Sequence, residues 1–148
     1  MLPLRLIIGF GLIAHGYSKL SAGPGKFAGM LQTLGVPAPG LMAWATALIE
    51  LIGGIAILVG AFVPIISIPL IIIMLVAMFT VHLPFGFSSV ALTGMTAGVP
   101  QFGPVGYELN LLYIAGLLTL ILGGPGPYSL DAIFARRKEH VETIEARA

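Results

Sequence analysis

Long apolar stretches, separated by short polar breaks or breaks rich in Gly and Pro, run through most of the 148-residue chain. A helix needs about 20 predominantly apolar residues to cross the hydrocarbon core of a bilayer. Stretches of about that length cover residues 2–20, 41–62, 65–83 and 105–122. The pattern therefore predicts an all-α fold, a transmembrane four-helix bundle formed as one domain by residues 1–131.

The segments between and after these stretches carry the remaining predicted elements. Residues 26–35 have an apolar face at helical spacing but are too short to span, so we expect a short helix at the membrane interface. The loop 84–106 has no charge and is rich in Gly, Pro, Ser and Phe, and we expect it to fold back over the bundle. Ser129 suits a helix N-cap. Residues 132–148 mix both signs of charge, which predicts a cytosolic helix or polar C-terminal tail.

The amino-acid composition supports a membrane protein and restricts its chemistry. The chain is 57% hydrophobic and 9% charged, whereas a soluble domain carries about a quarter charged residues. The formal net charge of +1 and the short basic run argue against nucleic-acid binding. Cysteine is absent, so this chain alone forms no disulfide, iron–sulfur cluster or thiolate zinc site. In redox chemistry the electrons would reside on a bound small molecule, on a metal held by N and O ligands, or on a partner.

The distribution of basic residues predicts the orientation in the membrane. Four spans place both termini on one side. Arg5 and residues 136–138 lie on that side, against Lys19 and Lys26 on the other. The positive-inside rule then favours a multi-pass protein of the inner (plasma) membrane with both termini in the cytoplasm. Arg5 is near the end of its stretch, where we expect its guanidinium to reach the headgroups.

Glu50 lies near the middle of the second stretch, where an ionised side chain is costly. It must face a partner or a water-filled cavity, or stay protonated. Ala43, Ala47 and Gly54 share one helical face with Glu50. Because small residues let a neighbouring helix approach closely in lipid, we predict that Glu50 points into the bundle.

Ionisable side chains from all four stretches fall in the half of the predicted bundle that lies opposite the termini. His15 and Lys19 are four residues apart on one face of the first stretch. At ~1.5 Å rise per residue, His82 and Glu108 lie within about one turn of this end of their stretches. The candidate ligand-binding residues are therefore His15, Lys19, Glu50, His82 and Glu108.

Four interpretations of this cluster are open. The first is a structural network, in which Glu50 pairs with Lys19 or His15. Glu108 would then stabilise the start of its own helix. The second is a pocket for a polar head such as a quinone, in which His15, Lys19 or His82 donates to its carbonyl oxygens and a glutamate exchanges protons. The third is an N2O2 metal site, which is less favoured because the Glu-x-x-His pairing of di-metal bundles is absent. The fourth is simple ion transport.

Short motifs follow one another along the chain in an order and spacing that are specific when taken together. They are Arg5 with His15-Gly16-x-x-Lys19, Glu50-x-x-Gly53-Gly54, Glu108 at the start of the fourth stretch, and the exit Gly124-Pro125-Gly126-x-x-Ser129-Leu130-Asp131. In this layout, which extends over nearly the whole chain, the sequence resembles the DoxX family of small four-span bacterial membrane proteins.

The resemblance implies a role in membrane redox chemistry. The founding relatives resemble a membrane subunit of a thiosulfate:quinone oxidoreductase, and other relatives are linked to oxidative-stress assemblies with soluble redox enzymes. A chain without cysteine forms no covalent sulfur intermediate by itself. We therefore expect a quinone-binding protein or the membrane subunit of an oxidoreductase complex, with a soluble redox enzyme and a second copy of the chain as candidate partners. The alternative is a non-enzymatic membrane scaffold or chaperone, in which the polar cluster is structural and the tail docks a partner.

Overall fold

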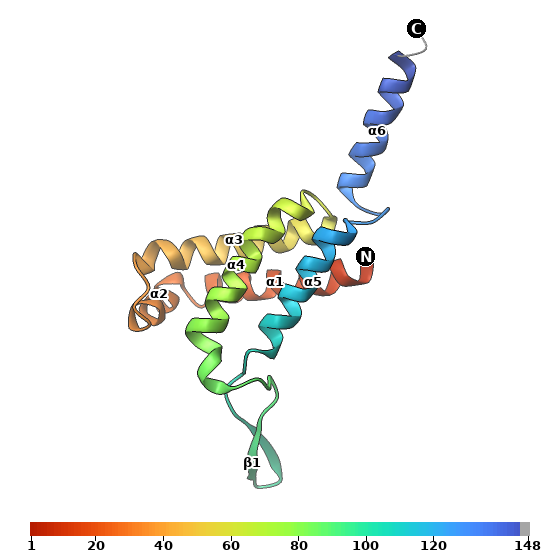
Figure 1. The fold of residues 1–148 in the computed structure, drawn as a ribbon. Coiled ribbons are helices and arrows are strands. Elements are labelled where there is room, and N and C mark those ends of the chain that lie inside the picture. The colour runs from red at the N-terminus through yellow and green to blue at the C-terminus, as the bar shows by residue number, and fades with distance from the viewer. Residues whose placement is uncertain (146–148) are drawn as a thin grey trace.

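A computed structural model describes the backbone of residues 1–145 and the side-chain surroundings of residues 1–137; the end of the predicted tail, residues 146–148, lies outside the described part. The elements are α1 (Leu2–Ser21), α2 (Pro24–Thr33), α3 (Pro39–Val59), α4 (Val63–Ala77), a π-helical turn (Met78–His82), a 3-10 turn (Leu83–Phe85), β1 (Leu92–Thr96), β2 (Val99–Phe102), α5 (Glu108–Gly123) and α6 (Leu130–Glu145) (Figure 1). All four predicted stretches are helical, and a short α2 follows the first of them.

Two helical stretches within the described residues are long and apolar enough to cross a membrane. They are Pro39–Val59 and Val63–Phe85, the second of which continues α4 through the two turns that follow it. α5 is apolar but shorter, with 16 residues. α1 carries Arg5, His15 and Lys19, which lower its hydropathy. The helical content of the prediction is thus confirmed, and the four-span bundle stays a prediction.

The helices associate as two antiparallel pairs, α1 with α3 and α4 with α5, and α3 and α4 join the pairs. Figure 1 shows that the pairs run in clearly different directions and separate toward the ends that carry α2 and the β-hairpin. Apolar side chains fill the region where the pairs cross. The buried core consists of Ile8, Leu12, Ile57, Val63, Leu70, Met74, Leu117 and Leu120.

Small residues allow the backbones of α1 and α3 to approach closely. A Cβ on Gly16 would lie 2.8 Å from the carbonyl oxygen of Ala47, and a Cβ on Gly54 would lie 2.8 Å from that of Gly9. Ala47 is fully buried and Glu50 is 1% exposed. The predicted small face of α3 is therefore confirmed, and Glu50 points from it into the protein.

Arg5 is buried, so the prediction that it reaches the headgroups is wrong. Its side chain is among the least exposed in the protein, at 2%. Nε donates to the carbonyl of Ile57 at 3.1 Å, and Nη2 donates to that of Leu58 at 2.9 Å. Nη1 donates to the carbonyls of Pro125 and Tyr128, both at 2.9 Å. The planar fork of the guanidinium thus joins the end of α3 to the segment before α6.

The start of α6 forms a junction with α4. The Ser129 hydroxyl accepts a hydrogen bond from the N–H of Ala132 at 3.1 Å, which confirms the predicted N-cap. The Asp131 carboxylate accepts from the N–H groups of Phe62 and Val63 at 2.8 and 3.1 Å. Asp131 therefore caps α4, whose first N–H groups have no partner within their own helix. Beyond this junction α6 projects away from the other helices (Figure 1).

The loop between α4 and α5 contains a two-stranded antiparallel sheet, so the all-α prediction is wrong in this segment. The strands are joined through Ala97 and Gly98, whose φ values are 50° and 81°. Two central residues with positive φ give a turn whose twist matches that of paired strands. The hairpin extends away from the helices (Figure 1), and its strand residues are exposed. The expectation that the loop folds back over the bundle is wrong for β1 and β2.

Candidate functional site

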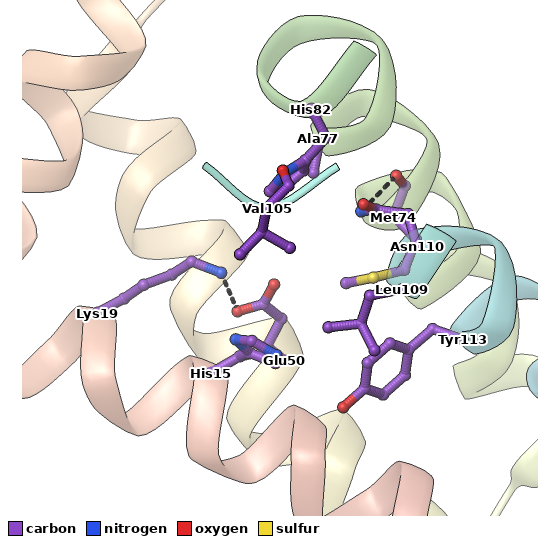
Figure 2. A pocket seen from close by; sticks show the side chains of 10 residues that line it. All are labelled: His15, Lys19, Glu50, Met74, Ala77, His82, Val105, Leu109, Asn110 and Tyr113. Carbon is purple, nitrogen blue, oxygen red and sulfur yellow. Dashed lines mark hydrogen bonds and ion pairs between the residues drawn. The ribbon is translucent and has the colours of Figure 1, made fainter. Parts of the chain in front are cut away.

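A cavity of about 220 Å³ lies among α1, α3, α5 and the C-terminal part of α4, away from the Arg5 end of the bundle. Figure 2 shows its lining side chains and the elements that present them. They are His15, Lys19, Glu50, Met74, Ala77, His82, Val105, Leu109, Asn110 and Tyr113. The structure thus brings four of the five candidate ligand-binding residues to one cavity, although they come from three separate parts of the chain.

The buried Glu50 carboxylate is paired with Lys19 at this cavity. The Lys19 ammonium donates to Oε2 of Glu50 (Figure 2). The Glu50 side chain is 2% exposed, whereas that of Lys19 is 23% exposed. The ammonium also lies 5.2 Å from the centroid of the Phe27 ring, a cation–π distance. Lys19 therefore links the buried carboxylate of α3 to α2.

Two histidines border the cavity in different states of hydrogen bonding. His15 is exposed, and its ring packs edge-on against Tyr113 with centroids 6.0 Å apart. Neither ring nitrogen of His15 bonds to a residue in the described part of the chain. Nδ1 of His82 lies 2.8 Å from the carbonyl oxygen of Val105. A carbonyl oxygen only accepts, so Nδ1 carries the proton and Nε2 of the neutral ring is an acceptor.

The local backbone explains how His82 and Asn110 are held. His82 ends the π-helical turn. Such turns are rare in proteins, and many of those known lie at functional sites. Asn110 is 6% exposed, and its Nδ2 donates to the carbonyl of Met74 at 3.3 Å. This bond fixes α5 against α4 next to the cavity.

Sequence reasoning did not assign Asn110 or Tyr113 to the site. The available signal for Asn110 is an amide inside an apolar stretch. Tyr113 follows it three residues later and therefore shares its helical face. Both belong to the fourth stretch, 105–122.

Glu108 lies outside the lining of the cavity. Its Oε2 accepts a hydrogen bond from the N–H of Ser89 at 3.0 Å, and the Ser89 hydroxyl accepts one from the N–H of Leu109 at 3.0 Å. These bonds fasten the base of the hairpin to the first turn of α5, where a carboxylate is also favoured by the helix dipole.

The side chains considered for an N2O2 metal site do not converge. Among the residues that the structure describes, no group of three or more His, Asp or Glu side chains lies close enough to hold a metal ion. Glu108 bonds to Ser89, and His82 bonds to the backbone. The cavity instead presents one cation, one carboxylate and two imidazoles, together with Asn110, Tyr113 and four apolar residues.

Comparison with known proteins gives a family and one curated relative. Residues 1–83 match the DoxX family. The chain is 28% identical over 144 residues to the uncharacterized membrane protein Rv3486 of Mycobacterium tuberculosis, a match that covers 90% of this chain and 80% of that protein. No solved structure matches the chain.

Proposed function

Because the chain belongs to the DoxX family and is a membrane protein, we propose that it acts in membrane redox chemistry by binding a quinone. It would do so alone or as the membrane subunit of an oxidoreductase complex. The observation that supports the proposal is the Glu50–Lys19 ion pair at a cavity that His15 and His82 also line. A soluble redox enzyme is the proposed electron donor.

The chemistry of a quinone fits these groups. Its carbonyl oxygens accept hydrogen bonds, and the Lys19 ammonium and a His15 N–H are donors at the cavity. Full reduction adds two electrons from the partner enzyme and two protons, which gives the quinol. Glu50 and His15 are the groups on this chain that exchange protons, since a carboxylate at membrane depth is a common proton relay.

The proposed location follows from the distribution of basic residues along the chain. We place the chain in the bacterial inner membrane with both termini in the cytoplasm, because the basic residues near the ends of the chain outnumber those near α2. The cavity then lies in the outer half of the membrane.

Quinone titration of the purified protein tests the function. We expect lipophilic quinone to co-purify, and a soluble quinone analogue to bind. Glu50→Gln and His15→Ala should each weaken binding about tenfold or more, since a hydrogen bond to a charged group contributes ~1.5–3 kcal/mol. Arg137→Gln, on the exposed surface of α6, is the matched control and should bind like the wild type. Absence of binding, or equal binding by all these variants, would contradict the proposal.

Glu108→Gln tests whether Glu108 belongs to the binding site, as the sequence predicted, or only holds the loop at Ser89. The structure puts its carboxylate on Ser89, outside the cavity. Quinone affinity should therefore change less than twofold. A loss of affinity comparable to that of Glu50→Gln would show that Glu108 takes part in binding.

A non-enzymatic membrane scaffold or chaperone is the second candidate, and α6 favours it. This helix projects from the bundle (Figure 1), and its Ile133 and Phe134 are 46% and 60% exposed. Under this function the Glu50–Lys19 pair only specifies helix pairing. Glu50→Gln would lower thermal stability with no ligand-dependent change, and deletion of residues 132–148 would abolish capture of the partner.

A further inference from the structure

A second cavity of about 420 Å³ adjoins the first, between α2, α3 and α4. The two cavities meet at one end, where five residues line both of them. The shared lining residues are His15, Lys19, Glu50, Ala77 and His82. The polar site therefore opens into a larger space on its α2 side.

Away from the shared end, the walls of the second cavity are apolar apart from two threonines. Apolar lining residues include Phe27, Met30, Ile49, Ile72, Ile73 and Val76. The hydroxyl of Thr80 donates to the carbonyl of Val76 at 2.7 Å, so it is satisfied within its own helix. Thr46 is the other polar side chain of this wall. Every ionisable side chain of the cavity thus lies at the end that it shares with the first.

The second cavity reaches the side of the helices, where lipid chains lie in a membrane protein. Ile72 and Val76 border it from α4 and are 55% and 49% exposed. Phe27 lies where the two cavities meet. It lines the second cavity, and the Lys19 ammonium lies over its ring. The polar cavity alone is smaller than the range of about 300–1,000 Å³ typical of small-molecule sites, and the two joined fall within that range.

We propose that the second cavity holds the hydrocarbon tail of the ligand whose polar head binds beside Glu50 and Lys19. This inference rests on the proposed function and narrows its ligand to a quinone with an extended apolar chain. The ligand enters from the bilayer between α3 and α4. Each methylene that leaves water for the cavity should strengthen binding roughly three- to fourfold.

The test compares a ring-only benzoquinone with the same ring carrying a ten-carbon tail, both titrated against the purified full chain in detergent. Wild-type protein should bind the tailed quinone at least tenfold more tightly. Ala45→Trp fills the second cavity and should remove this preference while leaving the affinity for the ring unchanged. Ala115→Trp, at an exposed position of α5 that lines neither cavity, is the matched control for partition into detergent and should keep the wild-type preference.

Val76→Trp provides an independent variant at the more exposed rim, should Ala45→Trp fail to fold. Equal affinity of the wild type for the two quinones, or an unchanged preference in a folded cavity-filling variant, would overturn the inference. In either case, loss of ring binding in Glu50→Gln would leave the proposed function standing. Binding of neither quinone would overturn both.

Discussion

Arg5 and Glu50 are both charged side chains buried among apolar helices, and their partners are of different kinds. Glu50 is paired with the ammonium of Lys19. Arg5 donates instead to four backbone carbonyls from two separate segments. Carbonyls at the end of a helix carry partial negative charge and lack N–H partners within the helix. The carbonyl of Ile57 also accepts from the N–H of Gly60, the C-cap residue of α3. Arg5 therefore stabilises the C-terminal end of α3 in the way that a capping residue does.

Replacement of Arg5 should destabilise the protein strongly. Arg5→Gln removes most of the four bonds, and we expect the free energy of unfolding to fall by about 3 kcal/mol or more, since a hydrogen bond to a charged group contributes ~1.5–3 kcal/mol. Arg5→Lys keeps the charge but lacks the planar fork, so its stability should be intermediate. Thermal unfolding in detergent measures the effect, with the exposed Arg137→Gln as control. An Arg5→Gln protein as stable as this control would refute the capping role.

The difference between these two residues also explains why the sequence predicted the surroundings of Glu50 correctly and those of Arg5 wrongly. The surroundings of Glu50 follow from its own helix, because the small residues one and two turns away mark the face that another helix must cover. The acceptors of Arg5 lie 52 to 123 residues further along the chain. No local pattern connects Arg5 with Pro125 or Tyr128, so nearness to a helix end pointed to the headgroups instead.

At the scale of elements, the α1–α3 pair depends on backbone contact at glycines. Gly54→Ala places a methyl group 2.8 Å from the carbonyl of Gly9, and we expect a loss of ~1–3 kcal/mol, as in other overpacked cores. Gly40 lies in the same helix with nothing within 4 Å of its Cβ position. Gly40→Ala should therefore stabilise by up to about 1 kcal/mol through helix propensity alone. Thermal unfolding of both variants decides the point, and a Gly54→Ala protein that gains stability like Gly40→Ala would argue against close packing.

The helices were predictable from hydrophobic length, and the β-hairpin was not. Its two-residue turn places Ala97 at positive φ, where Asn or Asp is the usual residue and the usual sequence signal. The surrounding Gly, Pro and Ser residues indicate a loop equally well. Only Gly98, followed by the short run from Val99 to Phe102, pointed to paired strands.

At the scale of the whole molecule, the two helix pairs are joined at the end that carries Arg5 and Asp131 and separate toward the site. The cavity is formed where side chains of both pairs face each other. Depth along each predicted helix was sufficient to bring His15, Lys19, Glu50 and His82 to one end. It did not give the direction of the Glu108 side chain, because that depends on the path of the loop around Ser89.

Cysteine labelling tests the proposed orientation, and a chain without cysteine suits it. Thr96→Cys lies next to the turn of the hairpin, and Arg137→Cys lies on α6. A membrane-impermeant maleimide should label the first in intact spheroplasts and the second only after lysis, since the proposed four spans would place these positions on opposite sides. Labelling of both in intact spheroplasts would contradict a four-span arrangement, and the reverse pattern would contradict its orientation.

The bonds of Arg5 also govern the order in which the chain can mature during synthesis. Two of its four acceptors, Pro125 and Tyr128, are made 120 and 123 residues after it. At ~5–20 residues per second, this interval lasts roughly 6 to 24 s. Throughout that time the nascent first helix holds a guanidinium that lacks at least half of its final partners, since Ile57 and Leu58 are also made 52 and 53 residues after it. The N-terminal helix can therefore reach its final packing only after the ribosome has passed the end of α5.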